Sequence, residues 1–340
     1  MIFCKNQYWL CSVCANLDLR RTSSLLSICR AQFLNLIILT SSAKPTVSLR
    51  TAALLTVPPL LWAGNAVVGR LVSEWVPPLT LNALRWIFAF VFLLPFTYKL
   101  LLPRSLLWVY WRRYALLGLL GVGSYNSFQY LALHTSSPIN VTLVGSIAPV
   151  VMLTLGVLFF GQKLRMRQCL GAVLSITGVL LVLCRGDLSQ AFNLHWVIGD
   201  IYVLIAVLAW SWYSWLLSGT QADPPEIRGD WKYFLMAQIV MGLGWSSVFT
   251  AGEWSLTPAH IVYSWPLLSA LMFVSLGPAI AAYRCWGLGI QRVGTNIAGF
   301  FANLTPLFAA VLSSLLLGEG PEVFHAVAFA LIVGGIYAAA

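Results

Sequence analysis

Ten residues with polar or aromatic side chains lie inside long apolar stretches of this 340-residue sequence, where they are the groups best able to contact a polar solute. They are Trp62, Asn65, Arg85, Tyr125, Asn126, Gln129, Trp210, Tyr213, Asn296 and Asn303. A buried amide costs a few kcal/mol if it is unpaired, so each must meet another helix, water or a solute. Hydrogen bonding between helices is the better explanation for any one amide, whereas the set as a whole favours a shared cavity. The chemistry predicted is substrate binding through hydrogen bonds and aromatic contacts.

The spacing of these residues supports a shared cavity. Trp62 and Asn65 lie three positions apart and so share one face of a helix, and Trp210 and Tyr213 repeat that spacing. Tyr125, Asn126 and Gln129 are likewise expected on one face of a third helix.

Two arginines, Arg85 and Arg284, lie within apolar stretches. A charge at the bilayer centre costs about 2.5–3.5 kcal/mol on insertion scales, so such residues usually face a wet interior. Either guanidinium could instead extend along the helix to the nearer interface. If Arg85 faces a cavity it favours an anionic or zwitterionic solute, because the apolar stretches contain no carboxylate to pair with it.

The sequence lacks the residues of a catalytic or metal site. The four histidines are scattered, and Cys11 and Cys14 form a CxxC pair that no second pair or histidine cluster completes. There is no GxSxG motif, no phosphate-binding glycine loop and no pair of carboxylates inside an apolar stretch. We therefore predict no catalytic residues, no metal, no cofactor and no enzyme activity.

One stretch of the chain occurs twice, beginning at Ser137 and again at Gly294. A shift of 157 positions places Pro149 on Pro306 and aligns glycines and leucines on either side. Each copy holds two apolar runs joined by a short connector, which is typical of a membrane hairpin. A proline inside a helix frees the carbonyl one turn earlier and bends the helix there. Pro149 and Pro306 are therefore predicted to be hinges, with a kink that only shapes packing as the alternative.

The composition, 59% hydrophobic and 9% charged, is far from the roughly 25% charged residues of a soluble domain. It predicts an all-α polytopic membrane protein. Runs long enough to cross a bilayer predict ten transmembrane helices, at 52–71, 79–101, 113–133, 138–160, 168–184, 199–218, 233–251, 265–289, 295–317 and 322–339.

These helices divide into two five-helix repeats, at residues 53–184 and 199–340. Residues 1–50 precede them as an extension that we expect to be disordered or to reflect a mis-assigned start. Because five is odd, the second repeat must enter the membrane inverted relative to the first.

Lysine and arginine are concentrated on one side of the membrane when the N-terminus is placed in the cytoplasm, and only Arg70 and Arg185 fall on the other. Both termini are therefore predicted to be cytoplasmic, and the net charge of +10 reports orientation and not nucleic-acid binding. The small residues Gly171, Ser175 and Gly178 share a helix face, which predicts close helix packing or a homodimer.

Several segments carry a resemblance to a known family: LLWAGN in the first predicted helix, PPLTLNALRW entering the second, SPINVTLVGSIAPVVMLTLGVLFFGQKL, and NLTPLFAAVLSSLLLGEG in the second half. Over residues 53–340 the chain resembles the two repeats of an EamA-type transporter of the drug/metabolite transporter superfamily. The resemblance implies a ten-helix carrier with an inverted repeat, usually exporting small metabolites such as amino acids or related compounds across a bacterial inner membrane. Gln162 stands where the family commonly has glutamate, so any role of that acid falls on Glu319 alone.

We therefore predict a secondary membrane transporter in the inner (plasma) membrane, working by alternating access on a small-molecule substrate. A membrane scaffold or assembly protein that retains the fold without transporting is the alternative. No carboxylate lies in the interior of a predicted helix, which leaves proton antiport, exchange and uniport open.

Overall fold

The computed structural model describes residues 47–135, 141, 144–184, 186–187, 197–219, 222–317 and 322–340. Throughout these ranges the regular structure is helical and contains no strand, which confirms the predicted all-α class. The predicted extension at residues 1–50 lies almost wholly outside the described residues, as does Glu319.

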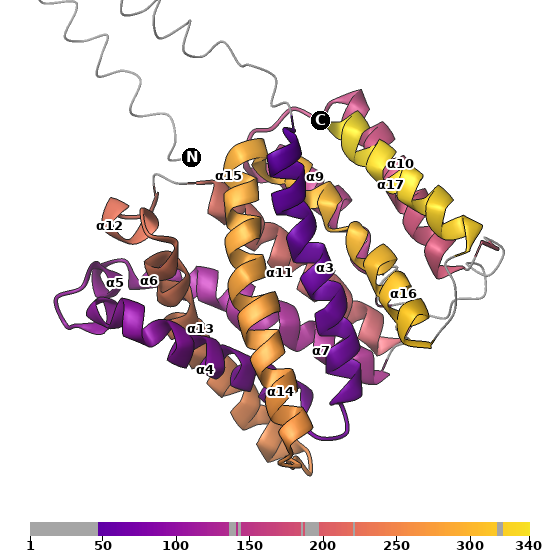
Figure 1. Ribbon diagram of the computed structural model, residues 1–340. Coiled ribbons are helices and arrows are strands. Elements are labelled where there is room, and N and C mark those ends of the chain that lie inside the picture. Colours follow the sequence, from indigo (N-terminus) through magenta and orange to yellow (C-terminus); the bar gives the residue numbers. More distant parts are fainter. Residues whose placement is uncertain are drawn as a thin grey trace, which may run out of the picture. The chain divides into compact units, whose positions relative to one another are not determined.

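The chain runs through two series of helices (Figure 1). The first comprises α3 (Leu49–Leu71), α4 (Pro78–Thr97), the 3-10 helix η1 (Tyr98–Leu101), α5 (Leu106–Val109), α6 (Trp111–Leu117), the π-helix η2 (Gly118–Ser124), α7 (Tyr125–Thr135), α9 (Ala148–Phe159) and α10 (Met166–Leu183). The second comprises α11 (Ile198–Ser218), α12 (Pro225–Arg228), α13 (Trp231–Leu256), α14 (Trp265–Val274), the π-helix η5 (Ser275–Ala281), α15 (Ala282–Phe301), α16 (Leu304–Leu317) and α17 (Val323–Ala339).

Within the described ranges, six segments are long and apolar enough to cross a bilayer, judged by length and composition. They are α3, α4 with η1, α10, α11, α13 and the stretch from Trp265 to Phe301. The predicted crossing at 113–133 is instead built from α6, η2 and α7 in succession. The crossing predicted at 295–317 is divided by a turn. The described part of the crossing predicted at 138–160 is divided in the same way. The predicted number of ten crossings stays a prediction.

Both halves carry a seven-residue π-helical segment at equivalent places. η2 begins at Gly118 and η5 at Ser275, so the two are related by the same shift of 157 positions that relates Pro149 to Pro306. The duplicated pattern therefore continues upstream of Ser137. π-Helical turns within α-helices are frequent at functional sites.

The two prolines lie just after breaks in their helices. Residues 146–147 form a turn before α9, in which Pro149 is the second residue. Residues 302–303 form a turn before α16, in which Pro306 is the third residue. The sequence predicts a bend inside a continuous helix one turn before each proline, and the structure has an interruption at that place. Broken helices of this kind expose backbone groups and can line a polar site within a membrane.

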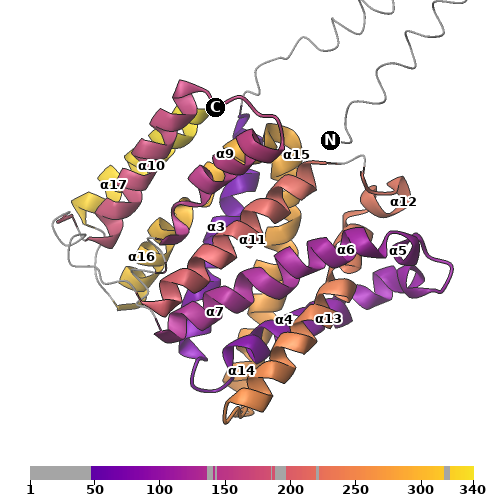
Figure 2. The same cartoon turned by 180° about the vertical axis from the view of Figure 1, so that it is seen from behind.

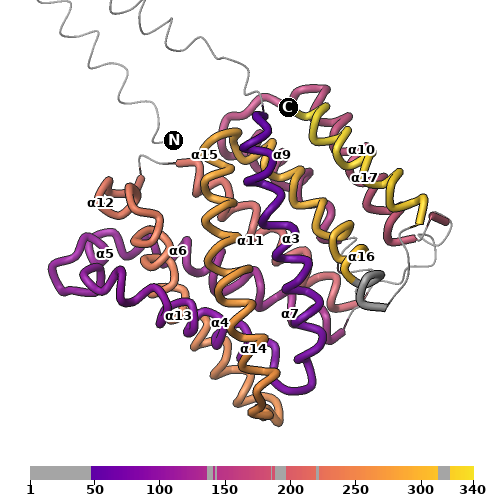
Figure 3. Tube along the Cα trace, viewed as in Figure 1, coloured from indigo at the N-terminus to yellow at the C-terminus, as the bar shows by residue number. Residues whose placement is uncertain are grey.

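Helices of one half pack on their counterparts in the other: α10 lies along α17, and α4 lies along α13 (Figures 1 and 2). Glycines allow the first pair to approach closely, because a Cβ atom added to Gly171 would lie 2.6 Å from the carbonyl oxygen of Gly335. The predicted small-residue face of α10 is thus occupied within the chain. α3 packs against α15 and α16, and α11 packs against α7, α9 and α15, so α3 and α11 form the centre of the described bundle (Figure 3).

Candidate functional site

A cavity of about 370 Å³ lies among α3, α7, α9, α11 and α16, and both helix breaks open onto it. Seven of the sequence-predicted residues line this cavity: Trp62, Asn65, Tyr125, Gln129, Trp210, Asn303 and Pro306. Ser146 and Asn303, which are related by the 157-position shift, supply side chains from the two breaks. The cavity extends along the C-terminal half of α3 as far as Arg70 and Leu71.

Aromatic rings form one wall of the cavity, with Trp210 at their centre. The ring centroid of Trp210 is 5.0 Å from that of Trp62 and 4.6 Å from that of Tyr125. Behind these, Trp210 also contacts Tyr213 at 5.1 Å and Trp286 at 5.5 Å. These separations lie in the range of favourable aromatic contacts, so the wall is a packed platform that a flat apolar group can stack on.

Asn65 presents a hydrogen-bond donor to the cavity. Its Oδ1 accepts a 2.8 Å hydrogen bond from the hydroxyl of Tyr130, and Arg85 Nη1 lies 3.5 Å from the same oxygen. A guanidinium can only donate, which fixes the amide with its oxygen toward Arg85. Nδ2 has no hydrogen-bond partner in the described part of the chain and is not sealed from solvent. It is therefore the part of Asn65 available to a solute.

Two other amides present acceptors. Asn303 donates from Nδ2 to the buried hydroxyl of Ser175, 2.9 Å away, and this leaves its Oδ1 for the cavity. Gln129 donates from Nε2 to the Tyr125 hydroxyl at 3.2 Å, which leaves its Oε1 in the same way. The cavity thus combines a donor backed by a cation, two amide oxygens and an aromatic wall.

The remaining predicted residues lie behind or beside the cavity lining. Arg85 is fully buried behind Asn65 and Tyr130. Tyr213 donates to Gln238 Oε1 at 2.9 Å. Asn126 is buried on α7, and Pro149 is buried near the start of α9. Asn296 lies next to Gly156 of α9, where its Oδ1 would be 3.3 Å from an added Cβ atom.

Tyr130, Ser146 and Thr305 line the cavity but were not selected from the sequence. Tyr130 follows Asn126 by four positions, which places it on the same helix face, and this spacing is the signal that could have identified it.

With this geometry the chain can be compared with known families. The model of the EamA-like transporter family matches residues 49–184 and 197–340. The chain belongs to this family. Its EamA repeats account for the two series of helices, and the protein is a multi-pass membrane transporter.

Relatives in several organisms carry transporter names. An uncharacterized transporter of Archaeoglobus fulgidus is 22% identical over 300 residues, covering 85% of this chain and 96% of the relative. An aromatic amino acid exporter of Ancylobacter novellus is 23% identical over 64% of this chain and 72% of its own length. A probable amino-acid metabolite efflux pump of Salmonella typhimurium is 24% identical over 82% of this chain and 90% of its own. A solved crystal structure with 20% identity aligns at a TM-score of 0.66 over 85% of this chain and 96% of the other, which shows the shared fold.

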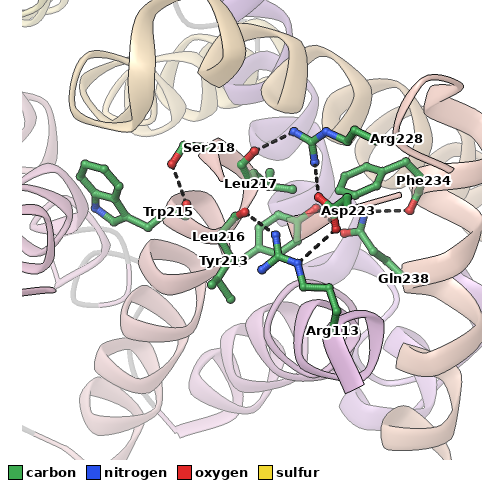
Figure 4. Close-up of polar contacts among 10 residues, drawn as sticks. All are labelled: Arg113, Tyr213, Trp215, Leu216, Leu217, Ser218, Asp223, Arg228, Phe234 and Gln238. Atoms are coloured by element: carbon green, nitrogen blue, oxygen red, sulfur yellow. Dashed lines mark hydrogen bonds and ion pairs between the residues drawn. The ribbon is translucent and has the colours of Figure 1, made fainter. Parts of the chain in front are cut away.

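A charged cluster of Arg113, Asp223 and Arg228 contacts the C-terminal end of α11 (Figure 4). The Asp223 carboxylate pairs with Arg113 Nε at 3.1 Å and with Arg228 Nη1 at 3.3 Å. The same guanidinium groups donate to the carbonyl oxygens of Leu216, at 2.6 Å, and Leu217, at 2.7 Å. Burial lowers the pKa of Arg228 from its ordinary value, and the Asp223 charge opposes that shift. Arg113 lies in the first turn of α6, so the cluster ties the first half of the chain to the second.

Proposed function

We propose that this EamA-family protein is a secondary transporter that exports amino acids or closely related metabolites. The observation that carries the proposal is the cavity at the two helix breaks. Its Asn65 donor suits a carboxylate, its Asn303 and Gln129 oxygens suit an ammonium group, and its aromatic wall suits an apolar side chain. The names of the Ancylobacter and Salmonella relatives support the same substrate class.

The topology proposed for this function is ten crossings in two inverted five-helix repeats, at residues 53–184 and 199–340. The protein lies in the inner (plasma) membrane, with both termini in the cytoplasm. The distribution of lysine and arginine supports this orientation. With it, α3 runs outward, and the cavity extends toward the outer face through Arg70 and Leu71. The cluster around Asp223 then lies on the cytoplasmic side.

Alternating access would move the repeats relative to each other about this cavity. The interruptions before Pro149 and Pro306 are the places where the backbone can change direction at least cost, because the helical hydrogen bonds are already broken there. The Asp223 cluster joins the repeats at the opposite end from the opening and would have to separate when the cavity opens to the cytoplasm.

Counterflow in proteoliposomes tests the proposal. Vesicles holding the full chain and loaded with unlabelled phenylalanine should accumulate labelled phenylalanine faster than empty vesicles. Asn65→Ala and Gln129→Ala should each lower that rate by about 10-fold or more at an unchanged amount of folded protein, because each removes a cavity-facing polar group. Ser269→Ala is the matched control, since Ser269 is exposed and its hydroxyl donates to the carbonyl of Pro266 in its own helix turn. Normal counterflow in both cavity variants would remove the amides from the site.

The alternative of a non-transporting scaffold is not favoured, because the relatives found are named as transporters. Absence of counterflow for every member of an amino-acid panel would return it to consideration. The predicted homodimer is tested by the mass of the protein in nanodiscs.

A further inference from the structure

Arg85 is a buried cation with no counter-charge among the described residues. Its side chain is 0% exposed, and its Nε and Nη2 atoms have no hydrogen-bond partner among the described residues. Its polar contacts in that part of the chain are Nη1 to the Tyr130 hydroxyl at 3.3 Å and to Asn65 Oδ1 at 3.5 Å. No ion pair to it occurs within the described ranges. A buried charge in this state is costly, so a residue that serves only packing would not be expected to carry it.

In the second half of the chain, a neutral pair occupies the place that Arg85 and Asn65 occupy in the first half. Arg85 is the eighth residue of α4, and Gln238 is the eighth residue of α13. Asn65 follows Trp62 by three positions in α3, and Tyr213 follows Trp210 by three in α11. By the order of the helices, and not by the 157-position shift, the Arg85–Asn65 contact between the first and second long helices corresponds to the hydrogen bond between Tyr213 and Gln238, which is 2.9 Å long (Figure 4). A neutral pair satisfies the helix packing in one half, so packing does not require the cation in the other.

The cation has a direct effect on the cavity. Because Arg85 and Tyr130 both turn toward Asn65 Oδ1, the amide is held with Nδ2 available to a solute. The interaction between two charges falls only as the inverse of distance and is strong in a low-dielectric interior. A guanidinium directly behind Asn65 therefore favours the binding of a negative group on the cavity side of that amide.

We propose that Arg85 makes this cavity selective for a carboxylate, acting as a positioning residue that holds Asn65 as a donor and places a positive charge behind it. The proposal rests on the proposed transport function and defines its substrate class as solutes with one carboxylate next to an apolar or aromatic body. The carboxylate supplies the negative charge that the described residues do not supply to Arg85.

The test compares probes that differ only in charge at this group. Calorimetric titration of the purified full chain measures the Kd of phenylalanine against phenylalaninamide, and of phenylacetate against phenylacetamide. The wild-type protein should prefer each acid over its amide by about 10-fold or more. Arg85→Gln installs the residue that the second half carries, and it should reduce both preferences to below about 3-fold by weakening acid binding alone. Arg85→Lys keeps the charge and should retain most of the preference.

Two further variants complete the design. Asn65→Asp places a carboxylate next to Arg85, neutralises it and should abolish the preference in a protein that still folds, which keeps the test valid if Arg85→Gln is not recovered. Arg284→Gln is the matched control, because Arg284 is exposed on α15 with its guanidinium 4.5 Å from the ring of Trp231, and both preferences should be unchanged.

Two results would overturn the proposal: equal binding of acid and amide by the wild-type protein, or equal weakening of acid and amide by Arg85→Gln, which is the signature of a structural role. If phenylalanine still exchanges in counterflow, only this inference fails. If the wild-type protein neither binds nor exchanges any probe, the transport proposal fails with it.

Discussion

Replacing Asp223 with asparagine should destabilise the protein far more than the same replacement at the neighbouring surface ion pair. The Asp223 carboxylate is fully buried, whereas the side chains of its partners Arg113 and Arg228 are 15% and 10% exposed. Asparagine keeps the shape of the side chain but removes its charge. Two guanidinium groups then face each other at the end of α11 without the carboxylate between them.

The expected loss of unfolding free energy depends on the contacts that the two guanidinium groups keep in the Asp223→Asn variant. Removing one partner of a buried ion pair costs about 3–5 kcal/mol. Here each guanidinium keeps a carbonyl acceptor, from Leu216 or Leu217, and some contact with solvent, which places the expected loss near the lower limit of about 3 kcal/mol. With the unfolding entropy expected for a chain of this length, that corresponds to a decrease in Tm of roughly 4 °C.

Thermal unfolding in detergent, followed by tryptophan fluorescence, measures the change. Asp230→Asn is the matched control, because Asp230 and Lys232 are 37% and 34% exposed and 3.5 Å apart, and asparagine can still cap α13. We expect that control to lose less than about 1 kcal/mol. Equal shifts for the two variants would refute the argument that the Asp223 cluster holds α11. A double-mutant cycle with Arg113→Gln should give a coupling energy above about 1 kcal/mol.

Three further substitutions test how the helices are held. Glu253 accepts hydrogen bonds at 2.8 Å from the backbone N–H groups of Leu79 and Thr80, so Glu253→Gln should remove charge from the N-terminus of α4 and lower stability by about 1–2 kcal/mol in the same unfolding assay. Gly335→Ala should prevent close contact of α10 with α17 and lower the yield of folded protein, whereas Gly334→Ala, where a Cβ atom meets nothing within 4 Å, should behave as wild type. Gly294 has φ of 81°, so Gly294→Ala should cost about 1 kcal/mol or more in backbone strain. Gly287→Ala, in the same helix α15 and with nothing within 4 Å of the added Cβ atom, should show no such loss.

The helical class and the repeat could be predicted because both depend on features of local sequence. Apolar runs identify helices, and the paired Pro149 and Pro306 identify the places where the helices are interrupted. The π-helical segments were not predicted, because a π-turn has the same hydropathy as an α-turn. Hydropathy also does not show the close packing at these segments. At Gly118, the first residue of η2, α13 approaches too closely for a side chain.

The site was predicted only in outline. Helical spacing shows which residues share a face, and Trp62, Asn65 and Trp210 do line one cavity. Spacing within a helix does not show which neighbouring helix that face meets, so the place of Tyr213 against Gln238 could not be derived. The Asp223 cluster was missed for the same reason, since Arg113 and Asp223 are 110 positions apart in the sequence.

The duplication makes the two halves alike in backbone but not in polarity, and the difference lies where a substrate would bind. Both halves break a helix before a proline, and both place a tryptophan three residues before a polar side chain that contacts the second long helix of its half. In one half that contact is Asn65 with a cation, and in the other it is Tyr213 with a neutral amide. A cavity built from two equivalent halves would bind a solute equally well in either of two opposite orientations. Because Arg85 is the charged member of these two contacts, the cavity has a positive end at Asn65 and acceptor oxygens at Asn303 and Gln129. If the cavity binds the carboxylate as proposed, a zwitterion has one favoured orientation in it, with its carboxylate at Asn65, and the divergence of this one contact between the repeats creates that preference.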